Sequence, residues 1–292
     1  MRSALAAAAV LVVLTAVASI SAAPAPSLPR VTIIADSAFA AVTGNQEPLA
    51  VVKSGFNVDI DVGICRRLAG TSCPSDGGVA PPTLVDVVHS LGPVIAPTVV
   101  VEVGYNEFVD TFPQSVETAI TTLLGAGVTK ILWLTMADGR PQYVPMNQVL
   151  AAAAGRHPEV ELVDWAAASR GHDSWFQGDS VHLTDDGALG VAHLLHDALM
   201  KALVPPLVVV PTQLPVAHVG KPYSVQLKAR GGILPYRWSL TSGPLPTGLH
   251  LLASGRVTGT PHRARKLGLS FRITDAVGQA TRLTTKITIA GR

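Results

Sequence analysis

The sequence predicts an α/β protein in which a doubly wound, three-layer domain with a five-stranded parallel sheet is followed by a small all-β sandwich. Short apolar runs alternate with amphipathic stretches between residues 31 and 204, as strands and helices do when they alternate along a chain. Between residues 207 and 291 short segments alternate at period two, are separated by Gly and Pro, and show no helical pattern. Pro205-Pro206 marks the boundary.

The elements of the first domain follow from hydrophobic pattern. We predict strands at residues 31–35, 57–61, 98–104, 130–136 and 159–165, nearly all continuous apolar runs because helices cover both faces of such a sheet. Helices are expected at 82–91, 115–124, 144–155 and 185–203. The flavodoxin-like strand order 2-1-3-4-5 would put the topological reversal between the first and third strands. In the second domain we expect strands at 223–229, 236–240 and 267–274.

The N-terminus has the pattern of an export signal. Arg2 precedes an apolar run at residues 4–20 that ends in small residues, which predicts a signal peptide at 1–23 and a secreted or cell-surface protein. A retained membrane anchor is the alternative, because the run approaches the length that spans a bilayer. After signal removal no membrane span is expected, and residues 24–30 form a Pro-rich tether.

The two cysteines and the charge balance limit the partners. Cys65 and Cys73 are eight positions apart in an exported chain, so a local disulfide is expected, with two free thiols as the alternative. Charged residues are 14% of the chain and the net charge is +2, which predicts no binding to nucleic acid, an anionic membrane or another polyanion. No metal and no other cofactor is expected.

Polar residues stand where strands of the predicted sheet end. Ser37 follows the first strand, Asn106 follows the third, and Asp179 and His182 precede the last helix. Ligand sites in open α/β sheets lie at this carboxyl edge, beside the topological reversal. We therefore expect these four side chains to meet in one crevice.

This set of residues predicts a serine nucleophile. A serine hydroxyl needs a base, and the base needs an orienting group, so we assign Ser37 as nucleophile, His182 as base and Asp179 as its partner. Asn106 and the backbone amides of Ser37 and Gly63 would form the oxyanion hole. Two alternatives stay open: His172 as the base, and Gly55 in place of Gly63.

The ordered blocks resemble the SGNH, or GDSL-type, superfamily of esterases and acyltransferases over residues 31–203. The resemblance implies that Ser37, Gly63, Asn106 and His182 are the four signature residues, with Asp179 three positions before the histidine. Ala35 departs from the glycine usual before the Asp-Ser pair, which raises the question of whether its methyl group crowds the nucleophile turn.

The C-terminal region resembles an immunoglobulin-like domain of bacterial surface proteins over residues 213–289. The segments that carry the resemblance are GKPYS at 220–224, GGILPYRW at 231–238, LPTGL at 245–249 and GRVTGTP at 255–261. It implies a module for spacing, attachment or binding of carbohydrate or protein, and no catalysis.

These inferences predict an exported hydrolase that cleaves acyl esters through an acyl-enzyme on Ser37. A small or polymeric ester is the expected substrate, and an acylated carbohydrate or cell-wall polymer fits an exported protein with a surface-type module. An acyltransferase using the same triad is one alternative. A non-catalytic surface-binding protein with a decayed site is the other.

Overall fold

The computed structural model describes residues 27–74 and 77–291. The predicted signal at 1–23 and the first residues of the tether lie outside this range. Among the described residues, the helices are too short or too polar to cross a bilayer.

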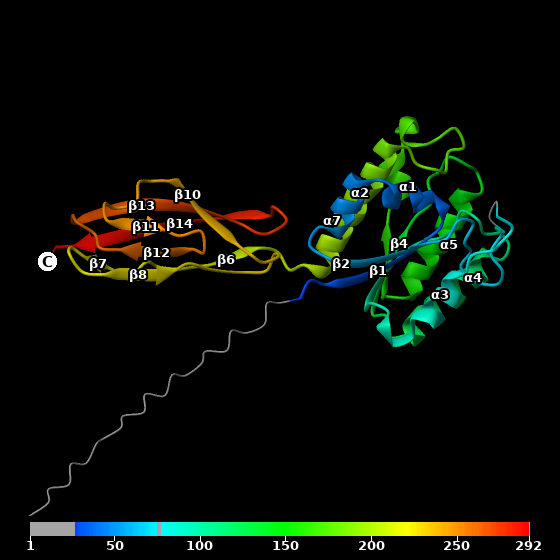
Figure 1. Cartoon of the computed structure of the whole chain (residues 1–292), viewed down its shortest axis with the longest axis horizontal. Coiled ribbons are helices and arrows are strands. Elements are labelled where there is room, and N and C mark those ends of the chain that lie inside the picture. Colours follow the sequence, from blue (N-terminus) through cyan, green and yellow to red (C-terminus); the bar gives the residue numbers. More distant parts are fainter. Residues whose placement is uncertain (1–26, 75–76, 292) are drawn as a thin grey trace, which may run out of the picture.

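The first half of the chain forms the predicted parallel sheet (Figure 1). Its strands are β1 (Arg30–Ala35), β2 (Asn57–Val62), β3 (Thr98–Glu102), β4 (Lys130–Leu134) and β5 (Val160–Val163), in the order β2-β1-β3-β4-β5. The predicted doubly wound fold and strand order are therefore confirmed. Ala35 pairs in register with Glu102, so β1 and β3 end side by side where the order reverses.

Helices cover both faces of this sheet. Helices α3 (Leu84–Leu91), α4 (Phe112–Gly125) and α5 (Tyr143–Arg156) enclose one buried cluster, and α1 (Ala40–Gly44), α2 (Gln46–Lys53) and α7 (Asp185–Leu203) enclose the other. The four predicted helices are present, with ends shifted by up to three residues. The unpredicted α1, α2 and α6 (Trp165–Ser169) are short, and Gly44 and Pro48 interrupt the helical pattern of the first two.

The C-terminal region is all-β, as predicted. It contains β6 (Val208–Val210), β7 (Ala217–His218), β8 (Tyr223–Gln226), β9 (Lys228–Arg230), β10 (Arg237–Ser242), β11 (Leu249–Leu251), β12 (Arg256–Gly259), β13 (Arg265–Thr274) and β14 (Ala280–Ala290). Sheets β10-β13-β14-β7 and β11-β12-β8 enclose a separate core around Trp238, Val257 and Phe271. Strands β6 and β9 form a third, two-stranded sheet. We call this region the β-module.

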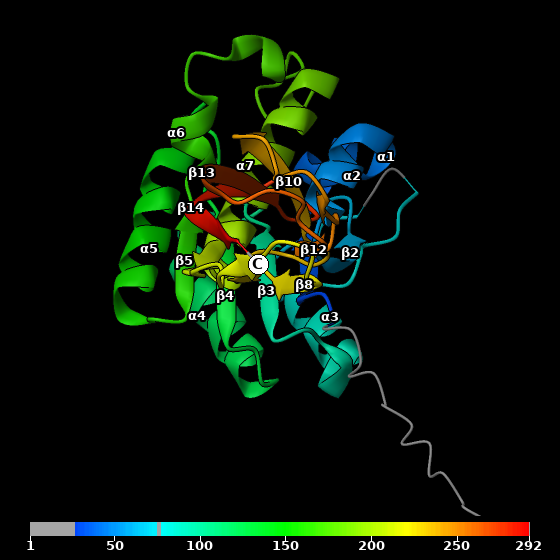
Figure 2. The same cartoon turned by 90° about the vertical axis from the view of Figure 1, so that its left-hand side faces the viewer.

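The β-module contacts the α/β region at the amino ends of its parallel strands. Ile233 and Val277 pack against the buried cluster beneath α7, and both lie close to Gly55, two residues before β2. Leu28 and Val204 line a small cavity of about 270 Å³ at the same junction. Figure 2 looks along this arrangement, with the β-module in front of the helical layers. The crevice at the carboxyl ends therefore lies at the opposite edge.

Candidate active site

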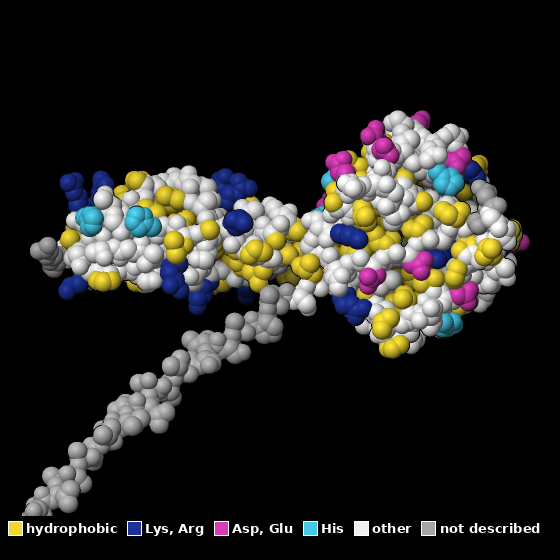
Figure 3. Space-filling model, in the orientation of Figure 1, with side chains coloured by type: hydrophobic (Ala, Val, Ile, Leu, Met, Phe, Trp, Pro, Cys, Tyr) yellow, Lys and Arg dark blue, Asp and Glu magenta, His cyan; other side chains and the backbone are white. Residues whose placement is uncertain are grey.

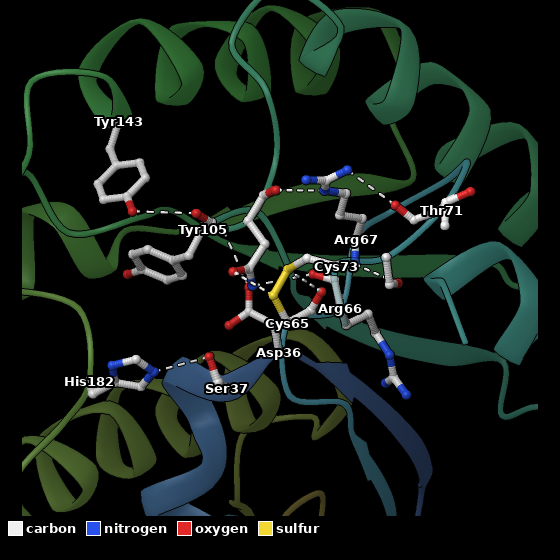
Figure 4. Close-up of a disulfide and its surroundings, with 12 residues drawn as sticks. Asp36, Ser37, Cys65, Arg66, Arg67, Thr71, Cys73, Tyr105, Tyr143 and His182 are labelled. Atoms are coloured by element: carbon white, nitrogen blue, oxygen red, sulfur yellow. Dashed lines mark hydrogen bonds between the residues drawn. A yellow bond between two sulfur atoms is a disulfide. The ribbon is translucent and has the colours of Figure 1, made fainter. Parts of the chain in front are cut away.

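The chain turns sharply after β1 and presents Ser37. Asp36 caps the short helix η1 (Ser37–Phe39), and its Oδ1 accepts a hydrogen bond from the Ala38 amide at 2.9 Å. The Ser37 hydroxyl lies 3.0 Å from Nε2 of His182, and Figure 4 shows the two side chains pointing toward each other. Ala35 is fully buried in the core, where its methyl group packs with the cluster beneath α7.

Asp179 holds the other side of the imidazole. Its Oδ2 lies 2.5 Å from Nδ1 of His182, and its Oδ1 accepts from the amides of Val181 and His182, both at 3.0 Å. Desolvation alone would raise the pKa of Asp179, but these three hydrogen bonds outweigh it and lower the pKa to about 2. The carboxylate is therefore charged and able to orient the ring. The structure thus brings Ser37, His182 and Asp179 into one hydrogen-bonded chain.

Backbone pairing fixes the loop that carries Asp179 and His182. The Gln177 amide donates to the His182 carbonyl at 2.7 Å, and the Thr184 amide donates to Trp175 at 2.9 Å. Arg140 donates to the Asp179 carbonyl from two nitrogens. Thr184 then caps α7, so the loop is anchored at both ends on regular structure.

Asp36 is a buried acceptor that orders the facing loop. Its Oδ2 accepts from the amides of Gly104 and Tyr105 at 3.3 Å and from Nδ2 of Asn106 at 3.4 Å. Asn106 therefore lies across the crevice from Ser37, as predicted from the sheet topology, with its amide group held by Asp36. Burial is the largest influence on Asp36 and raises its pKa to about 6.

A second buried acid, Glu102, lies behind Asp36. Its Oε2 is 3.4 Å from the Asp36 amide, and burial, reinforced by the charge of Asp36, raises its pKa well above the ordinary value. Of the two acids, Glu102 is therefore the one that releases its proton less readily. Glu102 was not among the residues predicted from the sequence, although a single acid at the end of the apolar strand TVVVE was a visible signal.

The structure corrects the assignment of Gly63 to the oxyanion hole. The Gly63 amide donates to the Ala35 carbonyl at 3.0 Å and extends the β1–β2 ladder, so this donor is already used. A Cβ at this position would lie 2.6 Å from Nε of Arg66, whose buried guanidinium packs against the strand end. Close approach of Arg66 explains the glycine. The alternative, Gly55, lies at the opposite edge beside Ile233.

Cys65, two residues after Gly63, lies beside Asn106 and has a backbone donor that no described residue uses. Its φ of +68° turns the backbone in the left-handed region, and its amide N–H meets no acceptor in the described part of the chain. Its sulfur is 3.7 Å from Oδ1 of Asn106, so the two residues are neighbours. The predicted disulfide to Cys73 is confirmed, with the Cα atoms 5.4 Å apart (Figure 4). A left-handed cysteine has no sequence signature, because glycine and asparagine usually fill such positions.

The alternative base, His172, takes a structural position. Its ring stacks on Trp175, with ring centroids 3.9 Å apart. Glu107 accepts a hydrogen bond from the Leu68 amide and so ties Asn106 to the disulfide loop. Residues 27–74 and 77–291 contain no group of three or more His, Cys, Asp or Glu side chains placed to hold a metal.

Comparison with known proteins gives a separate match for each region. Residues 205–290 match the family model described as "Putative Ig domain". Two Staphylococcus aureus proteins, from strains COL and MSSA476, are each described as "Putative O-acetyltransferase" and are 30% identical over 168 residues, which is 56% of this chain and 26% of theirs. The chain therefore spans about a quarter of the length of these relatives. Both resemblances predicted from the sequence are confirmed by these matches.

Two solved structures resemble the α/β region more distantly. TesA is 17% identical with a TM-score of 0.45, covering 60% of this chain and 99% of TesA. A family 3 carbohydrate esterase of Clostridium thermocellum is 12% identical with a TM-score of 0.42, covering 59% of this chain and 96% of the esterase.

Proposed function

We propose that this protein hydrolyses acyl esters through a serine acyl-enzyme. The observation that carries the proposal is the continuous hydrogen-bonded chain from Asp179 through His182 to Ser37. His182 takes the hydroxyl proton as Ser37 attacks the ester carbonyl, and it then gives the proton to the departing alcohol. A water molecule, activated by the same imidazole, then releases the acyl group.

The oxyanion formed during attack needs hydrogen-bond donors that are not already used. The Ser37 amide lies at the start of η1 and donates to no acceptor among the described residues. The Cys65 amide likewise donates to no acceptor among them. We infer that these two amides bind the oxyanion. Nδ2 of Asn106 donates to Asp36 and to the Arg66 carbonyl, both at the long distance of 3.4 Å, and it would join them by turning one N–H from Arg66 toward the substrate. Asp36 holds Asn106 in place without contacting the reacting atoms.

The relatives and the surroundings of the triad support a proposal for the substrate class. The curated relatives are described as O-acetyltransferases and one structural neighbour as a carbohydrate esterase, so we propose an acylated carbohydrate or cell-wall polymer as substrate. A mainly polar cavity of about 480 Å³ adjoins the catalytic loop, with Gly139, Arg170, Gln177 and Ser180 among its lining residues. Polar walls suit the hydroxyl groups of a sugar.

Transfer of the acyl group to a sugar hydroxyl is the second candidate, favoured by the description of the curated relatives. Water competes with such an acceptor unless the site excludes it. The side chains of His182 and Asp179 are 42% and 38% exposed, so water reaches the triad, and we place hydrolysis first. Faster acyl transfer to an added oligosaccharide than to water would reverse this order.

The first experiment is fluorophosphonate labelling together with hydrolysis of p-nitrophenyl acetate. We expect Ser37→Ala to abolish labelling, because the variant lacks the serine oxygen that reacts with the probe. It should also lower kcat/KM by about 10³-fold or more, because the other triad members cannot replace the nucleophile. Ser174→Ala is the matched control, since Ser174 is exposed on the nearby helix η3 (Asp173–Trp175) and should keep full activity. A folded wild-type protein that is neither labelled nor active would support the non-catalytic alternative instead.

A further inference from the structure

The near-zero net charge of the chain hides two regions of opposite sign. Residues 205–292 contain twelve Lys or Arg and a single acidic residue, Asp275, whereas residues 27–204 contain nine Lys or Arg and nineteen Asp or Glu. On the side of the molecule that Figure 3 shows, separate Lys and Arg side chains lie along the edges of the β-module, whereas the acidic side chains in view all lie on the α/β region. The expectation that the chain binds no polyanion rested on the summed charge, and the sum conceals this division.

The cations of the β-module have no protein partners. Asp275 is buried, and its carboxylate accepts hydrogen bonds from the backbone amides of Ile233, Val277 and Gln279. All eleven Lys and Arg side chains between residues 205 and 291 are exposed, and none makes an ion pair or hydrogen bond with another described residue. The ion pairs of the described chain all lie in the α/β region.

Five of these cations share the outer face of one sheet. Along β13 and β14 the inward residues, such as Phe271 and Leu283, are buried, so the alternate residues point to solvent. The outward cations are Arg237, Lys266, Arg272, Arg282 and Lys286, which we call the basic face.

The centre of the basic face brings two like charges together. Arg272 stands directly opposite Arg282 in the β13–β14 register, and Gly268 stands opposite Lys286. Like charges in directly opposed positions destabilise a sheet, unless an anion lies between them. Lys286 is four residues from Arg282, a step of about 13 Å along the strand, so the face presents positive charge at intervals along a line.

We propose that the basic face binds a linear anionic glycan, a polysaccharide that carries phosphate or carboxylate groups along its chain. Arg272 and Arg282 would share one anionic group, and Lys286 would meet the next. Ser239 stands opposite Arg272 on the outward side. The outward hydroxyls of Ser270 and Thr284 are hydrogen-bonded to each other at 3.2 Å, and each keeps further capacity to bond to a sugar hydroxyl. The binding is independent of the triad, so it extends the proposed function without depending on it.

The same face lacks the features that other polyanions need. The aromatic side chains of the β-module are Tyr223, Tyr236, Trp238 and Phe271, and none is exposed, so no platform for stacked bases is available. Exposed large apolar side chains, which help proteins to insert into a lipid surface, are absent from the described strands of this face. Charge and hydroxyls are what the face offers.

The test measures binding to named polymers with the whole chain carrying Ser37→Ala, so that turnover cannot interfere. The probes are poly(glycerol phosphate), polygalacturonate, neutral dextran, a single-stranded oligodeoxynucleotide, and phosphatidylcholine vesicles with and without phosphatidylglycerol. We expect binding to at least one anionic glycan, none to dextran, and a logarithm of affinity that falls linearly with the logarithm of salt concentration. The first two probes distinguish phosphate from carboxylate recognition.

A matched pair of triple variants locates the site. Arg272→Gln/Arg282→Gln/Lys286→Gln should weaken glycan binding by about tenfold or more and flatten its salt dependence. Lys228→Gln/Arg230→Gln/Arg256→Gln removes the same charge from other strands and should change affinity by about threefold at most. The single variant Arg282→Gln should raise Tm slightly while it weakens binding, because it removes the like-charge pair.

Each remaining outcome would overturn the proposal. Equal weakening by both triple variants would mean diffuse attraction with no site, and failure to bind either anionic glycan would exclude the ligand class. Tighter binding to the oligodeoxynucleotide or to anionic vesicles would assign the basic face to nucleic acid or to membranes instead. Circular dichroism of each variant checks that the β-module remains folded.

Discussion

At the scale of single residues, the nucleophile turn depends on a pair of buried acids with different hydrogen-bond surroundings. Asp36 collects four hydrogen-bond donors, from Ala38, Gly104, Tyr105 and Asn106, and so needs acceptor oxygens. The carboxyl of Glu102 accepts only from the Asp36 amide, and burial raises its pKa well above the ordinary value. Two adjacent buried carboxylates disfavour each other's charged form, and the carboxylate that accepts more hydrogen bonds holds its charge more readily.

The pair gives a test by isosteric substitution. Asp36→Asn places an NH₂ group among hydrogen-bond donors, so the side chain of Asn106 should no longer be held in place. Because hydrogen bonds to charged groups contribute about 1.5–3 kcal/mol, kcat/KM at pH 8 should fall by about 10- to 100-fold. Glu102→Gln is the matched control, because the Glu102 side chain accepts from a single amide and a Gln oxygen can accept the same bond, so activity should stay within about threefold. Comparable losses in both variants would contradict the different roles assigned to the two acids.

The pKa of Asp36 also sets a pH dependence of stability. The folded pKa, about 6, exceeds the ordinary value of 3.8, so between these pH values the folded state keeps a proton that the unfolded chain has lost. The contribution of Asp36 to the free energy of unfolding therefore falls by about 3 kcal/mol in total as pH rises through this window, and it is constant above it. Urea unfolding of wild type and Asp36→Asn across pH 4–7 should show a shallower slope in the variant; equal slopes would refute the shift.

Residue-scale roles were partly readable from the sequence. Ser37, Asn106, Asp179 and His182 could be placed because strand ends of a parallel sheet converge, whatever the detail of the loops between them. The proposed donor at Cys65 could not be found in this way, because a glycine needed for contact with Arg66 looks the same in sequence as one needed near a ligand.

At the scale of elements, the disulfide loop is the part of the site with least regular structure. Cys65 to Cys73 contains no helix or strand, and Arg67 and Leu68 bind it to the loop that carries Asn106. The bond between Cys65 and Cys73 therefore acts where the backbone of Cys65 must stay in a left-handed turn. We expect it to matter more for catalysis than for the fold.

Reduction tests this expectation. Cys65→Ala/Cys73→Ala should lower kcat/KM by about tenfold or more. Complete removal of an oxyanion donor typically reduces the rate 10²–10³-fold, and a Cys65 amide that is no longer held in place should lose part of that effect. The loss of unfolding free energy should be about 2.5 kcal/mol, the chain-entropy value for so short a loop. Dithiothreitol should reproduce both effects in the wild type and change nothing in the double variant. Full activity of the reduced, folded wild type would exclude the Cys65 amide as a donor.

Elements were predicted well where length and periodicity were clear. The strands β1, β3 and β4 are apolar on both faces and start within a residue of their predicted positions. The strand β14 was missed although it is long, because its sequence ATRLTTKITIA mixes Thr, Arg and Lys with few apolar residues. Its outward charges, the basis of the basic face, concealed it.

At the scale of the whole molecule, the junction joins two cores that are otherwise separate. Ile233 and Val277 belong to the β-module by sequence yet pack against the α/β core beneath α7. Such contacts couple unfolding of the two regions, because neither can open without exposing apolar surface of the other.

Calorimetry tests the coupling. Ile233→Ala should lower stability by about 2–4 kcal/mol and split a single unfolding transition into two, since buried Ile→Ala changes leave cavities. Leu252→Ala is the control, because Leu252 is also apolar and in the β-module but 48% exposed. One unchanged transition in Ile233→Ala would mean that the junction adds nothing.

The position of the junction has a consequence for kinetics. The β-module joins the amino edge of the parallel sheet while Ser37 opens at the carboxyl edge, so one short ester cannot contact both. A polymer held by the β-module would instead bring its acyl groups to the triad at an effective concentration in the millimolar range, as flexible tethers do. KM for a long polymer should then fall well below KM for its isolated repeat unit while kcat stays the same, and deletion of the β-module's charges should remove that difference.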